Sequence, residues 1–367
     1  MSPARRLPGL DGLRGLAALA IVVLHVWMYT GANDRREPRL LDMALGELRL
    51  GVPLFFVLSG YLLAGPWVAA ALGGRPVPDA RRFLARRLAR VAPGYWVAVA
   101  GSVAVLWGTG HPRAATLYDL PLFVLFAQNY FPQTAGHLDP PMWSLGIEVA
   151  FYAVLPVLGW GLVRARRRAA ALAGCAALAG LGLAWTAVGV RRGWPATTMV
   201  SLPTYLPVFA CGISAAVLAH GRRPGRAAAG ALLLAGASLV AADSLWHVDG
   251  TGFAGHVVRD LPAAAGLAAI VAAVSLRPAG VLSVAPLRFL GTISYGVYLW
   301  HLPVLLWLRT RGQFPHEPPG ALAAVLLPTL AIATASWYLV ERPCLRLHRR
   351  RARAWRREPA PAQAQAS

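Results

Sequence analysis

The chain has 367 residues, of which 57% are hydrophobic and only 14% are charged. A soluble protein of this length carries about a quarter charged residues, so the composition excludes an ordinary soluble globular domain. Lysine and arginine together number 36, all of them arginine, and the formal net charge is +21. Such a balance can indicate a nucleic-acid partner. Here the arginines cluster between apolar runs, which is typical of membrane orientation signals, so no nucleic-acid binding is expected.

Apolar runs recur along the chain and are bounded by Arg, Pro or Gly clusters. Each is about 20 residues long, which is enough to cross a bilayer as a helix. The sequence therefore predicts an all-α, polytopic transmembrane helical bundle. The ten expected spans are 10–31, 51–72, 91–109, 143–163, 169–189, 198–219, 226–246, 257–276, 289–309 and 320–341.

The distribution of arginine predicts the orientation of the bundle. With the N-terminus inside, 25 arginines fall in cytoplasmic segments and 10 in outer loops, as the positive-inside rule requires. We therefore expect both termini in the cytoplasm. Residues 1–345 would form the membrane-embedded domain. Residues 346–367, basic and then Pro/Ala/Gln-rich, would form a disordered tail whose basic part contacts anionic lipid.

The first apolar run contains two ionisable residues, Arg14 and His25. They are separated by about three helical turns, so they share one face with about 16 Å of rise between them. Ionisable groups inside a span are costly and indicate function by default. The alternative is structural: Arg14 would snorkel at the helix end, and His25 would bond to a neighbouring helix.

Three further polar residues fall near the depth of His25 once the spans are oriented, namely Ser59, Glu148 and His301. A histidine beside a carboxylate is a familiar general-base arrangement, because the carboxylate fixes the imidazole tautomer. We therefore expect Glu148 to orient His25. His301 would replace His25 as the base or bind substrate. A structural buried pair is the alternative.

A second basic feature, Arg86, Arg87 and Arg90, lies where a cytoplasmic segment enters the third span. Guanidinium groups match phosphate oxygens in a bidentate manner. These residues, with Arg14, are candidates to hold a phosphate-bearing donor whose long thin arm reaches His25. The alternative is that they only anchor the span at the inner surface.

Six motifs occur in chain order. They are Leu-Asp-Gly-Leu-Arg14-Gly followed by His25, Phe-Phe-Val-Leu-Ser59-Gly, Arg86-Arg87-Leu-Ala-Arg90-Val-Ala-Pro, Trp143-Ser-Leu-Gly-Ile-Glu148, Ile-Ser-Tyr295-Gly-Val-Tyr298-Leu-Trp-His301 and Val-Glu341-Arg-Pro. At these motifs the chain resembles the acyltransferase-3 family of integral-membrane O-acyltransferases, over nearly its whole length.

The resemblance implies transfer of an acyl group, commonly acetyl, from acyl-CoA to a hydroxyl of a sugar-containing acceptor. That acceptor would be a surface glycan, a glycolipid or a glycosylated, macrolide-type product. It implies His25 as the catalytic residue with Arg14 as its motif partner, Arg87 and Arg90 as coenzyme A contacts, and Glu148 as the supporting carboxylate. Acyl-CoA would be a substrate, with no tightly bound cofactor and no metal.

The resemblance also implies a bacterial cytoplasmic membrane. Little follows the last expected span, so we expect none of the periplasmic hydrolase-like extension of some members; transfer would then finish in this domain or with a separate acceptor-handling partner. Candidate substrate contacts or oxyanion donors are Ser59, Asn129, Tyr295 and Tyr298. An acyl-histidine intermediate remains open. The alternative function is a proton-coupled transporter with His and Glu as a relay, although no inverted repeat is evident.

Overall fold

The computed structural model describes residues 7–31, 40–107, 114–222, 224–245, 260–277 and 280–354. Every regular element within these ranges is helical. Nine of the described helical segments are long and apolar enough to cross a membrane, which confirms an all-helical, multi-pass membrane protein. The expected span 257–276 corresponds to a helix of only 16 residues, Leu261–Leu276, and residues 257–259 lie outside the described part of the chain.

The longer described helices overlap the expected apolar runs, except α15, which lies in the basic segment after the last run. They are α1 (Pro8–Tyr29), α3 (Gly51–Gly73), α4 (Ala80–Trp107), α6 (Trp143–Ala165), α7 (Arg168–Arg192), α9 (Leu202–Ala219), α10 (Arg226–Leu245), α12 (Leu261–Leu276), α13 (Ala285–Thr310), α14 (Pro318–Ser336) and α15 (Arg342–Ala354). Short helices connect them: α2 (Leu40–Gly46), η2 (Glu47–Leu50), α5 (Leu120–Val124), η3 (Gln128–Tyr130), η4 (Pro140–Met142), α8 (Ala196–Met199), η5 (Val281–Ser283) and the π-helix η6 (Trp337–Glu341).

Helix boundaries follow simple local chemistry. A proline occupies one of the first two positions of α1, α9, α12, α13 and α14, where its missing N–H costs no helical hydrogen bond. Gly74 and Gly193 end α3 and α7 in the left-handed conformation, with φ of 62° and 61°. A side chain would be strained at either position. Proline and glycine therefore set most of the helix limits.

Glycines bring the central helices into backbone contact. A Cβ on Gly291 of α13 would overlap the carbonyl oxygen of Asp11 in α1, and Gly15 packs against the same turn of α13. Gly60 of α3 and Gly212 of α9 meet in the same way, each against the backbone of the other helix. Small residues allow this close approach in membranes, where dispersion contacts replace the hydrophobic effect between helices. The backbones that carry the site are consequently held close together.

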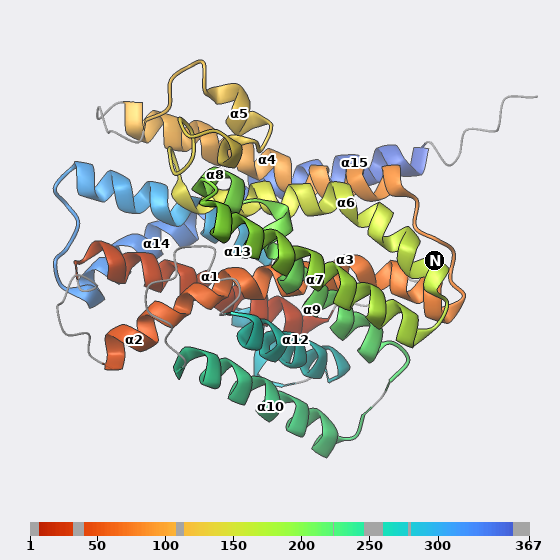
Figure 1. Cartoon of the computed structure of the whole chain (residues 1–367). Helices are drawn as coiled ribbons and strands as arrows, with labels where there is room; N and C mark the ends of the chain where they lie inside the picture. The colour runs from red at the N-terminus through yellow and green to blue at the C-terminus, as the bar shows by residue number, and fades with distance from the viewer. Residues whose placement is uncertain are drawn as a thin grey trace, which may run out of the picture.

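The remaining helices surround this centre. Figure 1 shows α10 and α12 along one side of the molecule and α4, α6 and α15 along the opposite side, with α1, α3 and α13 between them. α7 packs on α9, and α10 packs on α12. The basic helix α15 continues to Ala354, so the first part of the expected tail is helical. Residues 355–367 lie outside the described part of the chain.

Candidate active site

A large basic cavity opens at the end of the bundle where α1 begins. Its volume is about 740 Å³. It contains all four predicted phosphate-binding residues, which are Arg14 from α1 and Arg86, Arg87 and Arg90 from α4. The π-helix and α15 contribute the other wall, which includes Arg342, His348 and Arg349. We call this cavity the arginine mouth. Its positive charge makes it suitable for a ligand with several phosphates.

The arginines of the mouth differ in their partners. Arg90 is paired with Glu341 at 2.9 Å, and that carboxylate is almost fully buried. Arg14 reaches Asp11 through one nitrogen at 3.3 Å. The buried Nε of Arg87 has no hydrogen-bond partner within the described ranges. An unsatisfied buried donor is costly, so Arg87 is prepared for an acceptor atom on a ligand.

A second cavity of about 250 Å³ continues from the mouth into the bundle. Arg14, Arg87 and Arg90 line both spaces. Within this central cavity, Ser59 donates a hydrogen bond of 2.6 Å to Glu148. Tyr295 also lines it and donates to the carbonyl of Val91 at 2.8 Å. The central cavity therefore has arginines at the end that adjoins the mouth and the carboxylate of Glu148 on its wall.

His25 lies in a third space of about 240 Å³, which also contains Arg49, Trp143, Tyr205 and Asp260. We call it the His25 pocket. Arg49 is paired with both Asp260 and Glu47.

The direct partner of His25 is His301 on α13. The Nδ1 of His25 is 2.9 Å from the Nε2 of His301, and the two rings are stacked with centroids 5.0 Å apart. His301 is fully buried. The pair exists because α1 packs directly on α13 through the glycines described above.

The second ring nitrogen of His301 determines how the protons are arranged. His301 Nδ1 is 3.2 Å from the carbonyl oxygen of Val297. A carbonyl only accepts, so Nδ1 of His301 carries the proton and its Nε2 accepts in the neutral ring. His25 must then donate from Nδ1. The Nε2 of His25 is left with its lone pair, which is what a general base needs.

Tyr298 is the residue that the central cavity and the His25 pocket have in common. Its hydroxyl donates to the carbonyl of Pro141 at 2.7 Å and is 2.8 Å from the hydroxyl of Ser144. Its ring centroid lies 5.9 Å from that of His301. Tyr298 therefore lies between the arginine-lined side of the bundle and the histidine pair.

The structure divides the predicted polar cluster into two pairs. Depth along the membrane suggested that Glu148 would orient His25. Glu148 is instead bonded to Ser59, and His301 takes the place expected for the carboxylate. The reason is the direction around the helix axis in which each side chain points. α3 packs on α6, whereas α1 packs on α13. The rise per residue gives the depth of a side chain but not the neighbour that it faces.

Asn129 has a structural position in the connecting segment before α6. Its side chain is buried and donates to the carbonyl of Trp143. This hydrogen bond ties the connecting segment to the first residue of α6. Asn129 lines none of the three adjoining cavities.

Asp139 is another buried group in this segment, just before the membrane helix. Neither of its carboxylate oxygens has a hydrogen-bond partner within the described ranges. Burial raises the pKa of this carboxyl well above its usual range, because the charged form is poorly solvated.

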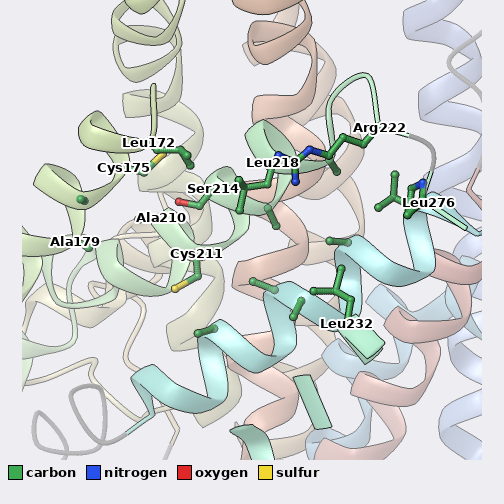
Figure 2. Close-up of a pocket in the computed structure, with 18 of the residues that line it drawn as sticks. Leu172, Cys175, Ala179, Ala210, Cys211, Ser214, Leu218, Arg222, Leu232 and Leu276 are labelled. Carbon is green, nitrogen blue, oxygen red and sulfur yellow. The ribbon is translucent and has the colours of Figure 1, made fainter. Parts of the chain in front are cut away.

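A separate apolar cavity of about 550 Å³ lies away from these groups, among α7, α9, α10 and α12. Figure 2 shows its labelled side chains, which are mostly aliphatic, with Cys175, Cys211 and Ser214 on one side and Arg222 at one end. None of the predicted site residues lines it. Its volume alone therefore does not make it the candidate active site.

Several lining residues were not predicted from the sequence. Arg49 and Asp260 at the His25 pocket lie in connecting segments, and no local pattern places them there. The α15 wall was more accessible to prediction. Arg342, Leu345 and Arg349 recur at helical spacing in the basic segment that follows the last expected span. A periodicity search of that segment would have shown that they share one helix face.

The fold and site define a class of protein: a polytopic membrane enzyme with a basic ligand mouth that leads toward a buried histidine pair. The acyltransferase domain family, acyltransferase-3, matches residues 7–338. The chain belongs to this family and is a membrane acyltransferase. This finding confirms the resemblance seen in the motifs and favours the enzyme over the transporter alternative.

The chain is similar to several bacterial proteins. Acyltransferase MdmB of Streptomyces mycarofaciens is 30% identical over 94% of this chain and 93% of its own length. Nodulation protein 10 of Rhizobium leguminosarum is 27% identical over 92% and 93%. O-acetyltransferase OatA of Staphylococcus aureus is 25% identical over 94% of this chain, which spans only 58% of OatA. No solved structure matches the chain.

Proposed function

We propose that the protein transfers an acyl group, acetyl in the simplest case, from acyl-CoA to a hydroxyl of a sugar-containing acceptor. The observation that carries this proposal is the series of adjoining cavities from the arginine mouth through the central cavity to the His25 pocket. The series has phosphate-binding chemistry at one end and a base at the other.

The donor would enter with its phosphates in the arginine mouth and its pantetheine arm in the central cavity. Arg87 supports this orientation, because its unpartnered Nε lies where the two spaces join. Arg90 would exchange part of its pairing with Glu341 for a phosphate oxygen. The thioester would then lie near Tyr298, which must shift for the acyl group to meet His25.

His25 is the proposed general base. The acceptor hydroxyl passes its proton to Nε2 of His25, and its oxygen attacks the thioester carbonyl carbon. The C–S bond then breaks, and the leaving sulfur takes the proton back from His25, which gives the ester and free coenzyme A. His301 accepts the Nδ1–H bond throughout and keeps the base in the required tautomer.

The acceptor would occupy the His25 pocket from the end opposite the mouth. Trp143 and Tyr205 give it aromatic faces, and the Arg49–Asp260 pair gives it charged hydrogen-bonding groups. A polyhydroxylated ring can use both kinds of contact. MdmB and OatA are named as an acyltransferase and an O-acetyltransferase, which supports the same chemistry without identifying the acceptor.

We place the arginine mouth at the cytoplasmic face of a bacterial membrane, where acyl-CoA is made. The bias of arginine toward this end supports that orientation. Cys344 is partly exposed at the start of α15, so an impermeant thiol reagent should label it in inside-out vesicles. Labelling in right-side-out vesicles alone would reverse the proposed orientation.

The direct test is transfer by the purified protein in vesicles. Acetyl-CoA labelled in the acetyl group is supplied with a panel of glycans, glycolipids and macrolide glycosides, and mass spectrometry searches for a new ester. The wild type should form one, and His25→Ala should not, at equal folding and yield. Equal product from both proteins would remove His25 from the chemistry. Labelled protein in the absence of acceptor would indicate an acyl-enzyme route instead of direct transfer.

A further inference from the structure

The arginine mouth has a second wall, which contains none of the predicted donor-binding residues. α1 and α4 supply the predicted donor residues, and α15 lines the opposite side of the cavity with Arg342, Leu345, His348 and Arg349. The neighbouring Arg346 and Arg350 do not line the cavity. Because 342, 345 and 349 recur at helical spacing, one face of α15 is turned toward the mouth.

Two arginines of the mouth lie over aromatic rings next to this wall. The guanidinium of Arg342 lies 5.3 Å from the ring centroid of Tyr338, and that of Arg90 lies 4.9 Å from that of Trp337. Both rings belong to the π-helix that precedes α15. Arg342 and Arg349 are seven positions apart, which is about 10 Å along the helix. The wall therefore presents two cationic positions at separate depths.

The mouth holds six arginines but only one aspartate among its lining residues. Like charges gathered in one cavity repel each other unless an anion enters. The cavity continues inward to the central cavity, so an anion bound there can carry an arm toward His25. A lipid headgroup satisfies the charge requirement but not the arm, because its tails must stay in the bilayer.

We infer that α15 is part of the donor site and recognises the nucleotide 3′-phosphate of coenzyme A through Arg349, with His348 beside it. This inference rests on the proposed use of acyl-CoA. The thioester is the innermost part of the donor and the nucleotide is the outermost part, so the 3′-phosphate meets the outer turns of α15. Arg342 and the arginines of α4 are then left for the diphosphate.

The test compares Arg349→Gln with the matched control Arg350→Gln in vesicles of neutral phosphatidylcholine. Equilibrium binding of acetyl-CoA, 3′-dephospho-acetyl-CoA and acetyl-pantetheine is measured without acceptor. Loss of one charge-assisted phosphate contact should weaken acetyl-CoA binding by about tenfold in Arg349→Gln. The other two donors should bind both variants within about twofold of wild type.

Equal weakening of all three donors, or no weakening of acetyl-CoA, would overturn the inference. The same binding measurements are repeated in phosphatidylglycerol vesicles. If Arg349→Gln weakens acetyl-CoA binding only there, the inference is also overturned, because Arg349 would then bind lipid headgroups. The same experiment separates this inference from the proposed function. Selective binding with no transfer to any acceptor would refute the proposed function and keep α15 in a nucleotide site. Transfer with unchanged binding in Arg349→Gln would do the reverse.

Discussion

The hydrogen bond between His25 and His301 gives the sharpest prediction. Replacing His301 by Leu removes the acceptor for the Nδ1–H of His25 while keeping a buried side chain of similar bulk. A neutral hydrogen bond contributes about 1 kcal/mol, or about fivefold. Loss of the correct tautomer in a catalytic histidine costs up to about 10⁴-fold. We expect kcat to fall by about 10- to 100-fold, which lies between these two limits. The fall stays below about 10⁴-fold because the backbone of Ile21 also bonds the His25 ring.

The control is His301→Gln, whose amide oxygen can still accept from His25. The two variants are compared in steady-state transfer assays, with kcat and the KM for acyl-CoA determined separately. His301→Leu should lower kcat and leave the KM for acyl-CoA within about twofold, since the arginine mouth is unchanged. His301→Gln should recover most of kcat. Full activity of the Leu variant, or equal damage in both, would show that His301 only fills space.

Three further predictions test other parts of the structure. Replacing Arg87 and Arg90 by Ala should raise the KM for acyl-CoA at least about tenfold and that of the acceptor much less; equal increases would leave these arginines as anchors. Asp139 has a raised pKa in the folded protein, so unfolding releases a proton and the native state loses stability as pH rises above the ordinary carboxyl value. Asp139→Asn should therefore melt at a higher temperature than wild type at pH 8, with a difference that shrinks toward pH 4; a constant difference would contradict the assignment. Gly291→Ala should destabilise the protein by about 1 to 3 kcal/mol through overlap with the backbone of α1, whereas Gly65→Ala, with open space around it, should be neutral or stabilising in the same thermal assay.

Much of the fold could be predicted from the sequence because the bilayer imposes a length on each apolar run. Proline and glycine marked the helix ends, and most long helices begin and end near the expected limits. The helices α12 and α4 differ from the expected spans. α12 ends at Leu276 as expected, but its described length is only 16 residues. α4 begins at Ala80, although its span was expected to begin at residue 91.

The site was predicted in composition but not in pairing. His25 and Arg14 do line opposite ends of a series of adjoining cavities, and the α4 arginines do line its mouth. Which side chain contacts His25 depends on helix rotation and on which helices pack together. Those are set by glycine contacts such as that of Gly291 with α1. The role of these glycines can be recognised only once it is known which helices are neighbours. For this reason Glu148 was the expected partner of His25, whereas His301 is the observed one.

The position of Tyr298 between the two halves of the path has a consequence for the cell as a whole. An enzyme that takes a substrate from each face of a membrane risks becoming a leak for protons and other ions. On the proposed route, the ring of Tyr298 would keep the central cavity apart from the His25 pocket, and the energised state of the membrane would be preserved between turnovers. A smaller residue there should be costly to growth even where it leaves catalysis intact.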